Sequence, residues 1–260
     1  MINKGFLLKT GFLVIVLAVV LAVIVAAMRS ASAADALGDR TFLGQFVIAG
    51  GAIVWFVLLP MSLLTVYLAA EYGLTIRRKR LLPAGIGSEI VDTIQRFGPE
   101  QLAAGISDRD DFVSVAVVKA LQQGRGDWFR MRSALAESLQ EQAGQLCRRI
   151  EWINLIGNVS PMVGLFGTVF GMIKLFNAIV TAGGQPQPAQ LADGISVALV
   201  TTFWGLFIAI PALSIHGVFR NRIETLISDA VEEAENIMPQ IRRILKKQTV
   251  RTANENSQSV

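Results

Sequence analysis

Apolar residues in this chain gather in long runs instead of being spread evenly. The runs 46–68, 153–180 and 191–219 are each long enough to cross a bilayer, since roughly 20 apolar residues are needed for a hydrocarbon core ~30 Å thick. No alternating pattern typical of β-strands competes with them. The sequence therefore predicts an all-α integral membrane protein with three transmembrane helices, at 45–72, 152–180 and 191–219.

The polar segments next to the second and third runs also have helical patterns. In 73–151, Ser88 and Asp108 are predicted to cap two short helices, the first of which ends at Gly98. From Asp127 no strong helix breaker appears before Pro161, so one helix is expected to continue into the second span. The tail, 220–260, is expected to extend the third span in the same way. The apolar positions that support these long helices are Met131, Leu135, Leu139, Leu146, Ile150, Ile153, Ile223, Leu226, Ala230, Ile237, Ile241 and Ile244.

A further apolar run, 11–28, lies near the N-terminus. It follows Lys4 and Lys9 and precedes a stretch of small residues that ends at Ala34. This order is typical of a signal peptide, here 1–33 with cleavage after Ala33. The alternative is an uncleaved transmembrane helix. In both cases the segment 34–44 is expected in the periplasm.

Charge gives the predicted orientation. The net charge is only +4, but basic residues lie directly beside the spans, at 77–80, 148–149, 220 and 222. The positive-inside rule places 73–151 and 220–260 in the cytoplasm, and the loop 181–190, without Lys or Arg, in the periplasm. Acidic residues are mixed into the same segments, which favours a topological role for the basic residues over nucleic-acid binding.

The second and third spans contain unusually many small residues. In the second span they fall near one helix face, with Pro161 between them, and the third span has a similar set. One interpretation is a close helix-packing face, which we expect to point inward in a homo-oligomer. The other is a narrow polar path lined by threonines. The residues are Gly157, Gly164, Gly167, Thr168 and Gly171, then Gly194, Ala198, Thr201, Thr202 and Gly205.

Two stretches carry a family resemblance. The sequences "SPMVGLFGTVFGMIKLF" and "ADGISVALVTTFWGLFIAIPAL", with a helical insert before the first and a charged helical tail after the second, resemble the MotA/TolQ/ExbB family of inner-membrane ion channel subunits. Three spans with an N-out orientation resemble the ExbB/TolQ branch.

The resemblance implies a pentamer of this subunit around single-span helices of an ExbD/TolR-like partner, energised by protons or sodium ions and with no other cofactor. It matches Thr168 and Thr202 to the channel threonines and Pro161 to the family's proline. One departure is Val197, which stands where ExbB and TolQ carry a glutamate. The partner's aspartate is then expected to bind the ion, and Thr201 would add an oxygen ligand if the ion is sodium. Otherwise Thr201 only bonds the carbonyl of Val197.

The functional hypotheses differ in class. The first is an ion channel subunit that couples an ion gradient to work on the envelope, such as TonB-type transport. The second is a non-conducting scaffold that anchors a partner, which the loss of the glutamate at Val197 favours. No catalytic motif is present, and His216 is interpreted as an interfacial residue, so an enzyme is not expected. Lys174 is expected to extend to the outer interface, with an ion-pathway role as its alternative.

Overall fold

The computed structural model describes residues 51–98, 111–124 and 127–258, and all regular elements within them are helices. Three of these helical segments are long and apolar enough to cross a membrane. The prediction of an all-α protein with three spans is therefore confirmed. The predicted signal peptide, the segment 34–44 and the Asp108 cap lie outside the described residues.

The first span is a single helical path with a π-helical section. It consists of α2 (Gly51–Ile53), the π-helix η2 (Val54–Leu58) and α3 (Leu59–Thr75). Short helices follow it: α4 (Arg78–Leu81), α5 (Ile86–Phe97) and α7 (Phe112–Gly124). Helix α5 ends at Gly98 as predicted, where the backbone turns with φ of +83°. Ser88 lies inside α5 instead of capping it, and its hydroxyl donates to the Gly85 carbonyl at 2.8 Å.

Two very long helices form the rest of the chain. Helix α8 covers Trp128–Thr181 and includes Pro161, and α9 covers Pro188–Gln258. Helix α8 begins where predicted, because the Asp127 carboxylate accepts a hydrogen bond from the Phe129 backbone N–H at 2.9 Å. The extension of the second and third spans into long helices is confirmed. The turn between them is shorter than the predicted loop 181–190.

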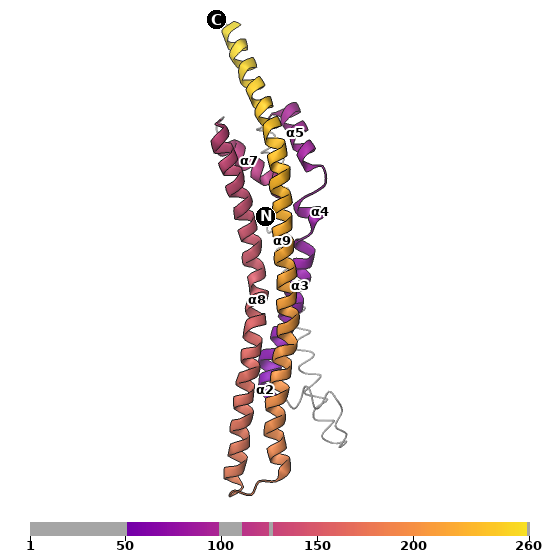
Figure 1. Cartoon of the computed structure of the whole chain (residues 1–260), viewed down its shortest axis with the longest axis vertical. Coiled ribbons are helices and arrows are strands. Elements are labelled where there is room, and N and C mark those ends of the chain that lie inside the picture. The colour runs from indigo at the N-terminus through magenta and orange to yellow at the C-terminus, as the bar shows by residue number, and fades with distance from the viewer. Residues whose placement is uncertain (1–50, 99–110, 125–126, 259–260) are drawn as a thin grey trace, which may run out of the picture. The chain divides into compact units, whose positions relative to one another are not determined.

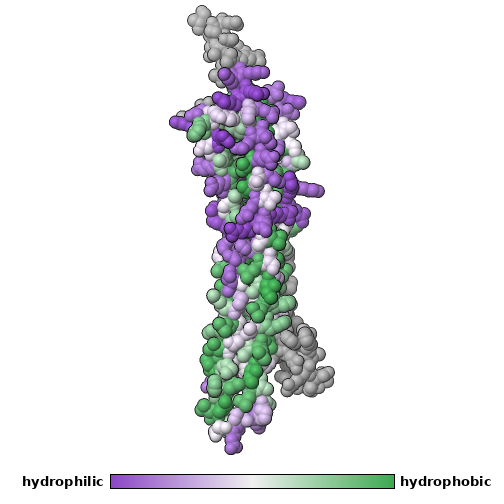
Figure 2. Space-filling model, viewed as in Figure 1, coloured by the Kyte–Doolittle hydropathy of each residue, from purple (hydrophilic) through white to green (hydrophobic). Residues whose placement is uncertain are grey.

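The chain divides into two compact units, which we name by their surfaces. Among the described residues, the membrane unit comprises 51–71 together with Glu151–His216. The extramembrane unit comprises 72–98, 111–124 and 127–150 together with 217–258. Figure 2 shows hydrophobic side chains over the surface of the membrane unit and hydrophilic ones over the extramembrane unit.

In the membrane unit, α9 contacts both other spans. Helices α8 and α9 lie side by side (Figure 1) and meet through small residues. A different face of α9 joins a core that includes η2, in which Val200 and Ile208 pack with residues of the other two spans. The buried members of this core are Val54, Leu58, Ile156, Val200 and Ile208.

The extramembrane unit has a core of large aliphatic side chains. The apolar positions predicted from helical spacing in α8 and α9 are buried there, except that Ile153 is buried in the membrane unit and Ile244 is half-buried. Ion pairs tie the helices together at the surface. Arg132 of α8 lies 2.7 Å from Glu235 of α9, and Lys119 of α7 lies 2.6 Å from Glu141 of α8. This unit is therefore organised like a water-soluble helical bundle.

Candidate ion pathway

The small-residue faces of α8 and α9 pack against each other within one chain. A Cβ added at Gly171 would lie 2.6 Å from the Gly194 carbonyl oxygen, and one added at Gly205 would lie 2.7 Å from the Ser160 carbonyl oxygen. A Cβ at Gly164 would lie 3.0 Å from the Thr201 carbonyl oxygen. Gly171 and Gly205 accept no side chain without a shift of backbone that would separate the helices, and Gly164 is in tight contact with its backbone neighbour.

The structure pairs the glycine face with α9 of the same chain. That these faces point inward in a homo-oligomer stays a prediction. A transmembrane helix hairpin needs such a face because lipid provides no hydrophobic drive for helix association, so close backbone approach has to provide contact area. Any contact between copies must then use other surfaces of the membrane unit.

Thr201 lies inside this helix contact. Its side chain is fully buried and faces Gly167, where a Cβ would overlap it. Its Oγ1 donates to the carbonyl of Val197 at 2.9 Å or to that of Ala198 at 3.0 Å. Within the protomer, Thr201 is therefore enclosed between α8 and α9 and does not face a surface along which an ion could pass. Its hydroxyl serves the backbone of its own helix, which is the alternative considered from sequence.

Thr168 and Thr202 lie at the edge of the contact and are half-buried. The Thr202 hydroxyl donates to the Ala198 carbonyl at 3.1 Å and lies 3.5 Å from the carbonyl oxygen of Gly164, one turn before Thr168. The Thr168 hydroxyl donates to the Leu165 carbonyl at 2.7 Å. Both oxygens keep lone pairs that can accept a hydrogen bond from water or from a hydrated ion. These two hydroxyls are therefore available to a neighbour outside the protomer.

Val197 is buried, with 4% of its surface exposed. No Asp or Glu occurs between Glu151 and Asp193 or between Asp193 and Glu224. The spans of α8 and α9 consequently offer hydroxyls but no carboxylate within their apolar sections. Pro161 is accommodated inside α8, where it cannot donate a backbone hydrogen bond to the carbonyl four residues earlier.

The two charged residues near the turn between α8 and α9 form a pair. Lys174 Nζ lies 2.6 Å from Asp193 Oδ2, and about half of each side chain is exposed. The sequence interpretation of Lys174 considered an interfacial lysine but missed this partner. The sequence did contain one indication of this pair, because both residues lie within a few helical turns of the same short loop. Placing a lysine in a membrane costs less free energy when a carboxylate neutralises its charge than when the lysine is isolated.

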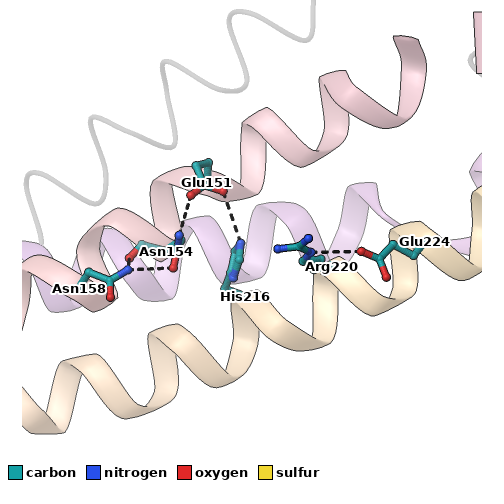
Figure 3. Close-up of polar contacts among 6 residues, drawn as sticks. All are labelled: Glu151, Asn154, Asn158, His216, Arg220 and Glu224. Atoms are coloured by element: carbon teal, nitrogen blue, oxygen red, sulfur yellow. Dashed lines mark hydrogen bonds and ion pairs between the residues drawn. The ribbon is translucent and has the colours of Figure 1, made fainter. Parts of the chain in front are cut away.

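Polar side chains also gather at the opposite end of the membrane unit, where Glu151, Asn154 and Asn158 of α8 adjoin His216 of α9 (Figure 3). His216, which the sequence analysis interprets as an interfacial residue, lies beside Glu151, with 3.7 Å between its Nε2 and Glu151 Oε2. Asn154 and Asn158 were not singled out from sequence, although their spacing of four places them on one helix face. No three His, Cys, Asp or Glu side chains of the described residues gather as a metal site would require.

Comparisons with known proteins agree with the pattern of the spans. Residues 107–232 match the model of the MotA/TolQ/ExbB proton channel family. The chain is 32% identical over 167 residues to the biopolymer transport protein exbB1 of Vibrio cholerae, an alignment that covers 63% of this chain and 73% of that protein. It is 37% identical over 94 residues to the Tol-Pal system protein TolQ of Pseudomonas aeruginosa, covering 36% of this chain and 40% of TolQ.

Among solved structures, a chain of C. jejuni MotAB matches 87% of this chain and 89% of its own length. Its sequence identity is 20% and the TM-score is 0.34, which is too low to support a detailed comparison of helix arrangement.

Proposed function

Because the chain belongs to the MotA/TolQ/ExbB proton channel family, we propose that it conducts protons together with an ExbD/TolR-like single-span partner and so drives mechanical work on the envelope. The chain is a multi-pass inner-membrane protein of the proton-channel type found in energy-transducing complexes. We propose TonB-type transport as the form of work, and the similarity to a biopolymer transport protein supports a role in transport. The working assembly is a homo-oligomer, a pentamer by resemblance, around the partner helices.

One observation carries this proposal. The glycine face of α8 is covered by α9 of the same chain. The hydroxyls of Thr168 and Thr202 lie at the edge of this contact and are half-exposed. Polar groups are rarely left facing lipid. We therefore place these two hydroxyls at a contact with another chain, where a narrow path for an ion passes between the protomer and its neighbour or partner.

The chemistry of the path requires a group from outside this subunit. Val197 and the other apolar positions of α8 and α9 supply no carboxylate within the spans. A cation that crosses a bilayer needs a compensating charge, so the partner helix provides it as an aspartate. We favour the proton over sodium because Thr201 is buried and already bonded to backbone carbonyls, which leaves too few oxygens for a hard cation.

The absence of an intramembrane carboxylate also favours a second candidate function. A subunit that anchors a partner without conducting ions needs the helix-packing faces, but it does not need a carboxylate inside its spans. The scaffold hypothesis predicts that the complete complex conducts no protons, whereas the channel hypothesis predicts proton flux. A flux measurement therefore distinguishes the two.

The experiment is proton flux in reconstituted vesicles. The protein, tagged at its C-terminal tail, is purified from its native membrane together with its single-span partner, and a parallel sample is prepared without the partner. We expect a trapped pH-sensitive dye to report flux for the complex and none for the subunit alone, and the flux to persist when sodium is replaced by potassium. A silent complex would favour the scaffold, and flux that requires sodium would exclude the proton.

A further inference from the structure

A chain of polar contacts runs from α8 to α9 at the end of the membrane unit opposite the interhelical turn (Figure 3). The Asn158 amide nitrogen donates to Asn154 Oδ1 at 3.0 Å and to the Asn154 backbone carbonyl at 2.9 Å. The Asn154 amide nitrogen donates to Glu151 Oε1 at 2.6 Å, and Glu151 Oε2 lies 3.7 Å from His216 Nε2. Four side chains thus form one connected polar group that ends in a carboxylate and an imidazole.

This group continues the helix stripe on which Thr168 lies. Positions 151, 154, 158, 161, 165 and 168 follow one another at alternating intervals of three and four, which keeps them on one side of an α-helix. At about 1.5 Å per residue the stripe from Thr168 to Glu151 is ~26 Å long. From Thr168 the stripe passes the apolar Leu165 and Pro161 and then reaches the polar group at the end of the span.

The polar group is open on its outer side. Asn158 is exposed, and 63% of the Glu151 side chain is exposed. An amide and a carboxylate on the surface of a membrane unit need water or another protein chain as a neighbour, because lipid cannot satisfy them. Among the described residues Asn158 Oδ1 accepts no hydrogen bond that would occupy it, so it can accept one from water in the path.

The two oxygens of Glu151 have different environments. Oε1 is held by a short hydrogen bond from Asn154, whereas Oε2 is too far from His216 for a direct hydrogen bond. Because Oε2 accepts no direct hydrogen bond from His216, a proton can bind there without first breaking a hydrogen bond. The side chain of His216 is mostly covered, with 12% exposed, and it limits where that oxygen can point.

We propose that Glu151 is the proton-exchange residue at the inner mouth of the path. A proton that arrives from the path through water binds Oε2 and makes the carboxyl neutral. It then dissociates from Oε2 to water on the inner side of the membrane, which restores the carboxylate. Asn154 and His216 are positioning residues for this step. The assignment depends on the proposed conduction, and it deepens that function by naming where the proton leaves.

The test is dye-reported proton flux through the partner-containing complex with Glu151→Gln. We expect flux to fall about tenfold or more, as is usual when a positioned acid–base group is lost. Glu151→Asp keeps the carboxylate and is expected to retain most of the flux. If Glu151 acted only through the length of its side chain, Glu151→Asp would lose more flux than Glu151→Gln. The matched control is Glu224→Gln, which removes an exposed carboxylate of the extramembrane unit that lies 3.1 Å from Arg220 Nε. The control is expected to conduct like the wild type.

The outcomes separate this inference from the proposed function. A wild-type complex without flux contradicts the proposed function itself. A conducting wild type with equal flux in Glu151→Gln overturns only the role of Glu151. If Glu151→Gln does not assemble, Asn154→Val decides instead, since it removes the donor to Oε1. We expect a severalfold loss of flux from that variant, and unchanged flux would overturn the proposal.

Discussion

Helices α8 and α9 contact each other through different kinds of residue in the membrane unit and in the extramembrane unit. In the membrane unit their contact is built mainly around glycines, Ala198 and a buried threonine, and at Gly164, Gly171 and Gly205 backbone lies close to backbone. In the extramembrane unit the same two helices bury large side chains such as Ile150 and Ile241 and add surface ion pairs. The difference follows from the solvent, because burial of apolar area stabilises contacts in water, whereas helices in lipid gain mainly from close packing.

The comparison also shows which surfaces remain for partners. In the membrane unit, large apolar side chains such as Phe166 and Phe207 point away from the α8–α9 contact and are more than half exposed. The half-exposed hydroxyls of Thr168 and Thr202 lie at the edge of that contact. A protomer whose small residues are already paired therefore offers a lipid- or subunit-facing surface with a few polar positions, as a subunit of a channel requires.

The largest expected effect comes from filling the glycine contact. Gly171→Leu would drive a side chain into the backbone of Gly194 and Ala198, and we expect a loss of about 3 kcal/mol, which should sharply reduce the recovery of folded complex. Gly217→Leu is the matched control, because no atom lies within 4 Å of a Cβ added there. The measurement is the yield of monodisperse protein in size-exclusion chromatography. Equal yields of both variants would mean that the close approach of α8 and α9 is not needed.

A smaller effect is expected from truncation of the aliphatic core. Ile241 is fully buried in the extramembrane unit, so Ile241→Ala should lower the stability by about 2–5 kcal/mol through lost burial and a cavity. Phe166→Ala removes more atoms from a side chain that is 64% exposed in the protomer, and its effect should stay within about 1 kcal/mol. Thermal unfolding of the purified protein compares the two. A larger fall in Tm for Phe166→Ala would indicate that this face is buried against another chain.

The smallest effect concerns the ion pair between α7 and α8. The hydrogen bond from Lys119 holds the pKa of the Glu141 carboxyl below its ordinary value of 4.5, and the same bond raises the pKa of Lys119 above 10.5. A lowered carboxyl pKa means that the stabilisation is complete at neutral pH and is lost as the pH falls through the folded-state value. The raised lysine pKa adds a loss at strongly alkaline pH.

Because this pair is solvent-exposed, Glu141→Gln should shift the Tm by only about 1 °C or less at pH 7. The wild type and the variant should then converge only when the pH falls below the lowered folded-state pKa of Glu141, where the carboxyl is protonated. Thermal melts at several pH values measure this difference. A gap between the two proteins that widened toward low pH would have the wrong sign for this pair.

Helix type and length followed from the sequence because they depend on local pattern. Uninterrupted apolar spacing from Asp127 through Ile153 predicted one helix into the second span, and the structure has it as α8. The cap of α7 shows the limit of such reasoning. Asp108 was predicted, whereas in the described residues the Asp111 carboxylate accepts the Ser114 N–H at 2.9 Å. Several acidic residues stand close together there, and sequence alone does not decide among them.

The candidate site was harder to predict because it depends on which helix faces which. The small-residue stripe was visible in the sequence, but nothing in it distinguished a neighbour in the same chain from one in another copy. Thr201 and Thr202 are adjacent and chemically identical, yet their directions differ by ~100°. One is buried against Gly167 and the other lies at the edge. The Lys174–Asp193 pair likewise required the turn between α8 and α9 to be known.

The most direct test of the proposed pathway compares the adjacent threonines with Thr168 in one flux assay. Valine has nearly the shape of threonine but lacks the hydroxyl, so each substitution removes one oxygen with little change in packing. We predict that Thr168→Val and Thr202→Val strongly reduce proton flux through the partner-containing complex, because their hydroxyls line the path. Thr201→Val should conduct like the wild type, because its hydroxyl only bonds backbone carbonyls of its own helix. Loss of flux in Thr201→Val, with flux retained in Thr168→Val and Thr202→Val, would contradict this account.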